Sequence, residues 1–265
     1  MLLSRLLSSM AFGLTLTQAT PLPDPASSDT TSAPAGADAH TQSAKYFQES
    51  SFSIHYDPRF ASASLNTTAE RAAARVLVQT YLSTLRDLGV QTWLAHGSLL
   101  GWWWNKQSLP WDVDADVQIS ERGLRFLAAY YNMTTWYYKY PTGVPAGRYF
   151  QLEVSPHYTS RTRDENNAVD ARWIDMDSGL FIDIAGVSRV EARDGVLASK
   201  DGREVREAQL FPLLETTFEG VRAKIPFQYE EMLASEYGER ALTDKVYKDH
   251  KFIDSEMEWV ASEEL

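Results

Sequence analysis

Three aspartates occupy alternate positions in the short segment PWDVDAD, directly after a proline and a tryptophan. Alternate side chains of a β-strand point to one face, so a strand here would place Asp112, Asp114 and Asp116 together, with the intervening apolar residues facing the core. Carboxylates held this close repel one another unless a cation neutralises them. Such oxygen ligands suit Mg²⁺ or Mn²⁺, especially when substrate phosphates complete the coordination shell. The segment therefore predicts a divalent-metal site.

Two other interpretations of the acidic segment fit less well. A solvated acidic loop is seldom found between a tryptophan such as Trp111 and an alternation of apolar residues. A calcium loop of the EF-hand kind also begins D-x-D-x-D, but its sixth position here is Val117 rather than glycine, and its twelfth is Gly123 rather than glutamate. The alternation favours the metal site.

A glycine and a serine stand upstream of the aspartates, in the segment HGSLLG. At a strand-to-helix turn, Gly97 and Ser98 would present backbone amides and a hydroxyl at a helix N-terminus, a position that favours a phosphate. Taken alone, Ser98 fits an ordinary helix cap equally well, and His96 fits a hydrogen-bonded core histidine. Followed by Asp-x-Asp on a strand, the pair resembles the nucleotidyltransferase superfamily, in which the serine turn holds nucleotide phosphates and the carboxylates hold metal ions.

A longer run, WLAHGSLLGWWWNKQSLPWDVDADVQIS, resembles the core motif of the LicD family. That family includes bacterial phosphocholine transferases, fukutin-type ribitol-phosphate transferases and fungal proteins linked to mannosylphosphorylation of cell-wall glycans. The later blocks DARWIDMDSGLFIDIAGV, FPLLETTFEG, IPFQYEEML and EYGERAL are similar to the fungal branch, so the resemblance spans about Lys45 to Phe252. It implies that Asp114 and Asp116 bind metal and that Asp112 belongs to the same cluster.

The resemblance also implies a third carboxylate on a neighbouring strand. Asp183 is the first candidate, because it is the lone charge in the apolar segment FIDIA and buried charges need partners. Glu153 in FQLEV is the second candidate. We therefore expect Asp114, Asp116 and Asp183 to be the catalytic residues, with Asp183 accepting the proton of the acceptor hydroxyl.

A phosphate-bearing donor needs cationic groups beyond the metal. Arg172 in DARWID is the first candidate, followed by Lys106 and Arg148. The tryptophans of residues 102–104 and Trp111 add aromatic surface. Most of these rings are expected in the core, with one or two left to stack on a base or sugar.

These residues and the resemblance together predict metal-dependent transfer of a phosphorylated sugar or alcohol to a glycan hydroxyl. The donor would be a nucleotide diphosphate of the GDP-mannose, CDP-choline or CDP-ribitol type, and the reaction mannosylphosphorylation of cell-wall glycoproteins. The partners would be the donor, a glycan or glycoprotein acceptor, and a separate glycosyl- or phosphotransferase. Two alternatives stay open: a non-catalytic LicD-like regulator of such a transferase, and a secreted carbohydrate-binding module.

The elements that must position these residues follow from hydrophobic periodicity. Residues 68–88 have helical spacing, with Thr68 as a candidate cap and Gly89 as the stop. A short strand, a Gly-Ser turn and an aromatic helix are predicted in QTWLAHGSLLGWWW. A strand is predicted in DVDADVQIS, and Ser120 is predicted to cap the helix that follows in ERGLRFLAAYY. Further strands are expected in RYFQLEV, ARWIDM, GLFIDIAGV and FPLLETTFEGVRAKIPF, and a helix in YEEMLASEYG.

Helices and strands that follow one another without regular alternation predict an α+β (mixed α/β) fold. We expect a nucleotidyltransferase-like mixed sheet flanked by helices, with a C-terminal strand and helix extension. The 265 residues are 44% hydrophobic, which is enough for a core, and the net charge of -11 argues against nucleic acid or an anionic membrane surface as the main partner. The absence of cysteine excludes disulfides and thiolate metal sites.

The N-terminal residues have the pattern of a secretory protein. Residues 1–19 carry an early cation, an apolar stretch and then small residues, which predicts a signal peptide; the stretch is shorter than the roughly 20 apolar residues of a permanent anchor. Residues 20–44 are small, polar or proline and predict a disordered linker, which leaves 45–265 for the LicD-like domain. Glycosylation sequons at Asn66 and Asn132 agree with a glycoprotein of the Golgi lumen or the exterior.

Overall fold

A computed structural model describes residues 44–139 and 147–264. The predicted signal peptide and all but the last residue of the predicted linker lie outside the described residues. Within the described part of the chain, no helix is both long and apolar enough to cross a membrane.

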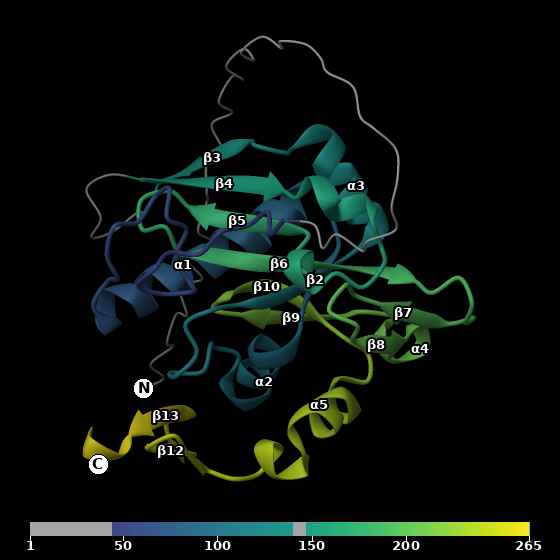
Figure 1. Cartoon of the computed structure of the whole chain (residues 1–265). Coiled ribbons are helices and arrows are strands. Elements are labelled where there is room, and N and C mark those ends of the chain that lie inside the picture. Colours follow the sequence, from purple (N-terminus) through teal and green to yellow (C-terminus); the bar gives the residue numbers. More distant parts are fainter. Residues whose placement is uncertain (1–43, 140–146, 265) are drawn as a thin grey trace, which may run out of the picture.

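The main sheet has eight strands in mixed orientation (Figure 1). Its central path runs β1-β2-β6-β5-β4-β3, and β7 and β8 extend it from the end of β6. The strands are β1 (Thr92–Leu94), β2 (Asp116–Ser120), β3 (Thr135–Tyr138), β4 (Arg148–Val154), β5 (Ala171–Asp175), β6 (Phe181–Arg189), β7 (Val196–Ala198) and β8 (Glu204–Arg206). β2 pairs with β6 in parallel, whereas β5 pairs with both β4 and β6 in antiparallel orientation. The predicted mixed α+β fold is confirmed.

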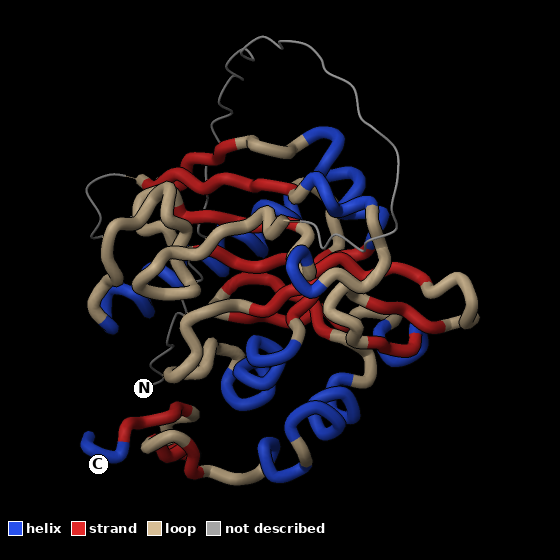
Figure 2. Tube along the Cα trace, in the orientation of Figure 1, coloured by secondary structure: helices blue, strands red, loops and turns tan. Residues whose placement is uncertain are grey.

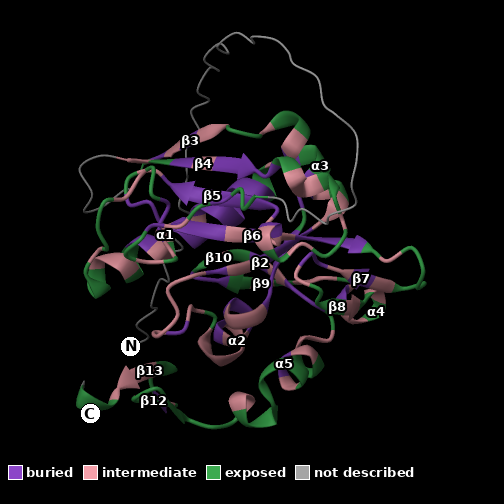
Figure 3. Cartoon of the chain, in the orientation of Figure 1, coloured by how far each residue is buried: buried purple, intermediate pink, exposed green. Residues whose placement is uncertain are grey.

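Helices cover this sheet and connect its strands, as Figure 2 shows. They are α1 (Thr67–Asp87), α2 (His96–Asn105), α3 (Glu121–Tyr130), α4 (Glu207–Leu210) and α5 (Tyr229–Tyr237), with single turns η1 (Pro156–Thr159), η2 (Glu165–Asn167), η3 (Glu239–Leu242) and η4 (Ser262–Glu264). α1 packs against β5, β6 and β10 (Val221–Ile225), and α3 against β2 and β6. Because these helices pack on the sheet, its central strands are largely buried (Figure 3).

The two faces of the central strands differ in chemistry. Val117 and Ile119 of β2 and Ile184 of β6 are buried in the main hydrophobic core with residues of α1 and α3. Asp116 and Asp183 alternate with these residues and therefore point to the opposite face. The apolar face anchors the sheet, and the other face is left to carry the polar side chains.

The predicted first helix is confirmed, with a different cap. Asn66 rather than Thr68 is the cap, because the Asn66 side-chain oxygen accepts a hydrogen bond from Ala69 N at 2.9 Å. Gly89 follows the helix with φ +69°, a left-handed conformation that glycine adopts at low cost. The predicted Ser120 cap of α3 is confirmed, since its Oγ accepts from Gly123 N at 3.2 Å.

A hairpin and a small separate sheet complete the chain. β9 (Leu214–Phe218) and β10 form the predicted antiparallel pair, and α5 follows it. β11 (Val246–Tyr247), β12 (His250–Ile253) and β13 (Glu258–Ala261) form a three-stranded sheet of their own. This C-terminal extension, residues 229–264, is yellow-green to yellow in Figure 1 and lies on the α2 side of the main sheet.

The acidic segment is where the structure differs most from the predicted elements. Of the three aspartates, only Asp116 belongs to β2. A turn at residues 110–111, closed by a hydrogen bond from Asp112 N to Leu109 O, precedes irregular backbone over residues 112–115. One reason is the length of β1: its last paired residue, Leu94, faces Val117, so β2 has no partner on that side before Asp116, and β6 on the other side does not extend it although β6 begins at Phe181. The predicted strand from Asp112 is therefore wrong over its first half.

Candidate functional site

Four charged residues form a row across neighbouring strands of the main sheet. Asp116 on β2 is paired with Asp183 on β6, Asp183 with Arg172 on β5, and Arg172 with Glu153 on β4. Adjacent strands lie about 4.8 Å apart, so the first two carboxylates are immediate neighbours on one face. The sheet itself therefore brings together two of the predicted catalytic residues.

The row also separates the two candidates for the third carboxylate. Glu153 lies three strands from Asp116, is buried, and accepts hydrogen bonds from Arg59 Nη2 at 2.6 Å and from the Tyr46 hydroxyl at 2.9 Å. Asp183 keeps 42% of its side chain exposed, although Arg172 Nε donates to its Oδ1 at 2.7 Å. The geometry favours Asp183, and its binding of metal stays a prediction.

The other two aspartates reach the same place from the irregular segment before β2. Asp112 is hydrogen-bonded to Asp114, and Asp114 Oδ2 lies 3.8 Å from His55 Nδ1. A methyl group added to Gly97 would lie 2.5 Å from Asp112 Oδ2 and 3.1 Å from Asp116 Oδ2, so both carboxylates flank the space above this glycine. A turn, rather than the alternation of a strand, gathers the acidic cluster Asp112, Asp114 and Asp116.

These carboxylates resist ionisation together. Burial raises the pKa of Asp112 to about 8, and the hydrogen bond to Asp114 and the charges of Asp114 and Asp116 add to it, whereas Lys248 opposes the shift. Burial also raises the pKa of Asp116, with the charge of Asp114 next in size. The pKa of Asp183 is raised as well, because partial desolvation of its half-exposed carboxylate outweighs the charge of Arg172. A cation at this position would remove the repulsion.

The fit of a metal can be judged from the donor set. Carboxylate oxygens of the acidic cluster and of Asp183 are the hard ligands that Mg²⁺ and Mn²⁺ take. Within residues 44–139 and 147–264, however, no three carboxylate or imidazole groups already converge as a metal's ligands would. The chemistry therefore fits a divalent cation, and substrate oxygens would have to complete its shell.

The start of α2 positions Asp116. Gly97 N donates to Asp116 Oδ2 at 2.9 Å, and Asp116 N donates to Ser98 Oγ at 2.9 Å. The predicted Gly-Ser turn is absent, because α2 begins at His96 and both residues lie in its first turn. His96 is not a core histidine, since its Nδ1 lies 2.8 Å from Glu236 Oε1 at a partly exposed position. Phosphate binding by Gly97 and Ser98 stays a prediction.

Gly97→Ala tests this close approach. We expect the variant to fold, because Gly97 is helical and alanine is the better helix former, but the methyl group must displace the Asp112 and Asp116 carboxylates. Manganese affinity, measured by titration calorimetry, should fall by about tenfold or more. Unchanged affinity in a folded variant would show that the two carboxylates do not share a cation.

Of the predicted cations, the structure brings only Arg172 next to the acidic residues. Arg172 is 1% exposed and donates to Asp183, Glu49 Oε1 and Gln48 O, with its guanidinium 3.6 Å from the centroid of the Phe181 ring. Lys106 lies at the far end of α2, and Arg148 is bonded to Asp175 at 2.6 Å. Their roles in donor binding stay predictions.

A cavity of about 600 Å³ opens beside the acidic cluster, which we call the donor cavity. The C-terminal extension supplies its other wall, including two cations, Arg240 and Lys248, and the Trp259 ring. Neither cation was among the predicted donor-binding residues: Arg240 lies in the block EYGERAL, which carried no functional prediction, and Lys248 lies in no quoted block. Aromatic residues bring the two walls of the cavity together. The centroid of the Trp259 ring lies 5.0 Å from that of Trp111 and 4.8 Å from that of Trp104.

The tryptophans of the aromatic helix are partly buried rather than fully in the core, and Trp102 and Trp103 pack against the main core. Trp102 Nε1 donates to Thr216 Oγ1, and Trp103 Nε1 donates to Leu242 O. Trp104 and Trp111 line the donor cavity. Among the described residues, Trp259 Nε1 is a buried side-chain donor without a hydrogen-bond partner, and it belongs to a residue that lines this cavity.

The raised pKa of Asp112 predicts how stability depends on pH. A carboxyl whose pKa rises from 3.8 to about 8 on folding favours the folded state at low pH, and this contribution is lost as the pH rises toward 8. In metal-free protein, Asp112→Asn should therefore reduce the fall in unfolding free energy between pH 5 and 8 by at least about 1.4 kcal/mol, the equivalent of one pKa unit. Urea denaturation across this range measures it, and equal pH slopes for both proteins would contradict the expectation.

Comparison with known proteins places this site in a family. The model for the LicD/FKTN/FKRP nucleotidyltransferase domain matches residues 89–228, from the end of α1 to the start of α5. Mannosyltransferase regulator 4 of Saccharomyces cerevisiae is 35% identical over 143 residues, 52% of this chain and 12% of that protein. Mannosyltransferase regulator 14 of the same yeast is 36% identical over 157 residues, 54% of this chain and 16% of that protein. The chain thus matches only a small part of these relatives, and it belongs to the LicD family.

Proposed function

We propose that the protein acts in glycan mannosylphosphorylation as a metal-dependent transferase, moving a phosphorylated sugar or alcohol from a nucleotide diphosphate to a glycan hydroxyl. The observation that carries this proposal is that the acidic cluster lines the donor cavity and that one of its members, Asp116, is paired with Asp183 on the neighbouring strand. Membership of the LicD family and the names of the two yeast relatives support a role in mannosylation.

The acidic residues and the first residues of α2 have different proposed roles. Asp112, Asp114, Asp116 and Asp183 would hold Mg²⁺ or Mn²⁺, which supplies charge neutralisation at the donor phosphates. Gly97 and Ser98 keep Asp116 in place through the two hydrogen bonds described above. Asp183 would also accept the proton of the incoming hydroxyl, because it is the carboxylate next to Asp116 on the neighbouring strand and its side chain is partly exposed.

The opposite wall of the donor cavity suits an anionic, aromatic donor. Lys248 and Arg240 place positive charge across from the acidic cluster, where phosphates would bridge the two. Trp111 and Tyr247 supply ring surface for a nucleobase, and Trp259 Nε1 is a hydrogen-bond donor awaiting an acceptor. This arrangement supports a GDP-mannose type donor as well as the CDP-choline and CDP-ribitol types.

A regulatory function is the second candidate. Both yeast relatives are named mannosyltransferase regulators, and within the described residues no three ligands already converge on a metal. In this account the protein keeps the LicD fold and assists a separate transferase in the secretory pathway. The exposed sequon residues Asn66 and Asn132 are compatible with that location, which stays a prediction.

An activity screen with a cellular complementation arm distinguishes the two functions. The purified protein would be incubated with Mn²⁺, a mannan acceptor and each of GDP-mannose, CDP-choline and CDP-ribitol, and the product read by mass spectrometry. The proposed function predicts phosphodiester product with at least one donor and no complementation by Asp116→Asn. A regulator gives no product, and its Asp116→Asn variant complements as well as the wild type.

A further inference from the structure

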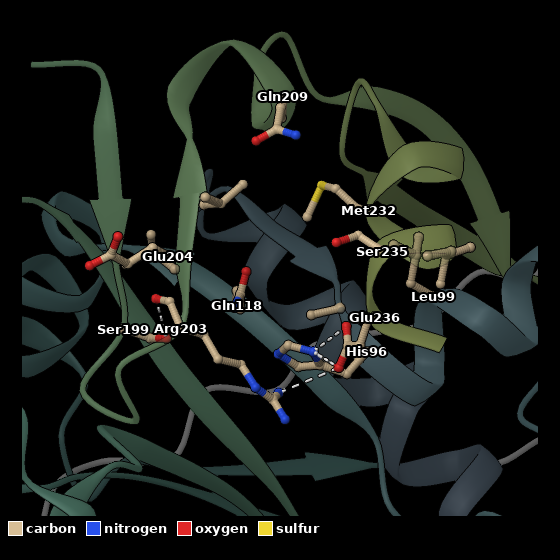
Figure 4. Close-up of a pocket in the computed structure, with 14 residues that line it drawn as sticks. His96, Leu99, Gln118, Ser199, Arg203, Glu204, Gln209, Met232, Ser235 and Glu236 are labelled. Atoms are coloured by element: carbon tan, nitrogen blue, oxygen red, sulfur yellow. Dashed lines mark hydrogen bonds and ion pairs between the residues drawn. The ribbon is translucent and has the colours of Figure 1, made fainter. Parts of the chain in front are cut away.

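A second cavity, of about 380 Å³, is lined by His96, Gln118 and Glu236 among others (Figure 4). We call it the saccharide cavity. Its walls come from the start of α2, from α5, from the β7–β8 hairpin with its turn and from α4. A cavity of this size falls within the usual range for small-molecule sites, roughly 300–1,000 Å³. None of the functional residues predicted from the sequence accounts for it.

Gln118 lines this cavity and is aligned by a neighbour. It is 8% exposed, and its Oε1 accepts a hydrogen bond from Trp93 Nε1 at 3.0 Å, which fixes which end of the amide is the acceptor. Within the described part of the chain, its Nε2 has no hydrogen-bond partner. A buried amide with an unused donor at the edge of a cavity is poised to bind a ligand oxygen.

The charged groups around the cavity are already paired. Glu236 Oε1 lies 2.8 Å from His96 Nδ1 and 3.7 Å from Arg203 Nη1, and Glu204 is held by Arg193. Burial would raise the pKa of Glu236, but the hydrogen bond and charge of His96 and the charge of Arg203 outweigh it, so the pKa is lowered. No unpaired charge of the described residues selects for an anion or a cation here.

Polar and apolar groups alternate around the same cavity. Gln209 and Ser235 offer further hydrogen-bonding atoms, while Leu99, Val205 and Met232 form an apolar surface. A ligand that matches this lining has many hydroxyls, no net charge and an apolar ring face. A saccharide has these properties.

The position of Gln118 shows that the cavity lies near the acidic cluster. Gln118 follows Asp116 by two residues on β2, so both side chains point to the same face at a separation of roughly 7 Å along the strand. His96, which also lines the cavity, directly precedes Gly97. A hexose bound in this cavity would therefore lie within about the width of one sugar ring of the Asp116 side chain.

We propose that the saccharide cavity binds one or two neutral hexose units and, resting on the proposed function, that these belong to the acceptor glycan whose hydroxyl is directed at the acidic cluster. Gln118 Nε2 donates to a sugar hydroxyl, and Met232 contacts the ring face. The donor cavity and the saccharide cavity then lie on either side of Asp116, with the His96–Glu236 pair at the edge of the second.

Saccharide binding without metal tests this assignment. The probes are methyl mannoside and α-linked mannobiose, followed by titration calorimetry and saturation-transfer NMR with the full chain. Gln118→Glu keeps the acceptor for Trp93 but replaces the Nε2 donor by a carboxylate oxygen. Met232→Trp fills the cavity without touching the acidic cluster. Each substitution should weaken mannobiose binding by about tenfold or more.

The matched control is Gln151→Glu on β4. Residue 151 is half-buried and lines neither cavity, so this variant should bind mannobiose as the wild type does. Thermal unfolding verifies that every variant is folded. Wild-type protein that binds neither sugar, or binding that survives both Gln118→Glu and Met232→Trp, would overturn the assignment. Binding of manganese and donor without saccharide defeats only this inference, whereas saccharide binding without any donor binding defeats only the proposed transfer.

Discussion

Asp116→Asn is expected to lower manganese affinity and donor turnover by at least about 100-fold. Asp116 is the carboxylate that touches every part of the site: it pairs with Asp183 across the strands, shares the space above Gly97 with Asp112, and lines the donor cavity. The asparagine oxygen can still accept from Gly97 N, so the start of α2 should be unaffected. Titration calorimetry with Mn²⁺ and the mass-spectrometric transfer assay measure the two effects.

The same substitution at an exposed aspartate provides the control for Asp116→Asn. Asp177 lies in the turn between β5 and β6, outside both cavities, so Asp177→Asn should leave manganese affinity and turnover unchanged. The metal-free Asp116→Asn protein should be at least as stable as the wild type, because the substitution removes a buried charge that burial and Asp114 disfavour. Wild-type manganese affinity in Asp116→Asn would remove this residue from the metal site.

Arg172→Met is expected to lower the free energy of unfolding by about 2–3 kcal/mol, less than the usual cost of breaking a fully buried ion pair, because the carboxylates that lose their partner are partly exposed. Arg172 is 1% exposed, and its guanidinium binds Asp183, Glu49 and Gln48 O and lies over the Phe181 ring. Methionine fills much of the space but satisfies none of these acceptors. Urea denaturation at neutral pH measures the loss.

Two further variants show whether the geometry of Arg172 or its charge alone is needed. Arg172→Lys keeps the charge but loses the planar fork, so it should recover only part of the lost stability. Arg189→Met removes an exposed arginine, 74% accessible and paired with Glu207, and should change stability by less than about 0.5 kcal/mol. A loss below about 1 kcal/mol for Arg172→Met would mean that the network does not stabilise the fold.

The elements with strong periodicity could be predicted from the sequence. β4 spans the predicted RYFQLEV, α5 falls within YEEMLASEYG, and α1 begins one residue before the predicted start. These segments are long or regular enough for local preference and tertiary packing to agree. The choice of Asp183 as a carboxylate beside Asp116 also came from local pattern, because a lone charge in an apolar strand needs a partner.

The acidic segment shows where local pattern fails. Its period of two predicted a strand from Asp112, but β1 stops at Leu94, so β2 loses its antiparallel partner before Asp116, and β6 on the other side does not extend it. Strand pairing is decided by a neighbour 20 residues away in the chain, which alternation within the segment cannot register. The carboxylates still meet, through a turn and because Gly97 has no side chain to fill the space between them.

The cationic wall of the donor cavity lies beyond the reach of sequence reasoning for a similar reason. Lys248 and Arg240 belong to the C-terminal extension, which follows the region matched by the family model. Contacts between aromatic rings far apart in the sequence, such as Trp104 and Trp259, place that extension against α2. Aromatic content can be counted in a sequence, but which rings meet depends on the folded chain.

Metal-dependent donor binding is the central claim, and calorimetric titration of GDP-mannose into the full chain tests it most directly. We predict saturable binding with Mn²⁺ present, loss of binding when EDTA removes the metal, and loss of binding in Asp116→Asn. CDP-choline and CDP-ribitol are titrated in parallel. Folded wild-type protein that binds none of the three donors with either Mn²⁺ or Mg²⁺ would contradict the account and leave the regulatory function in its place.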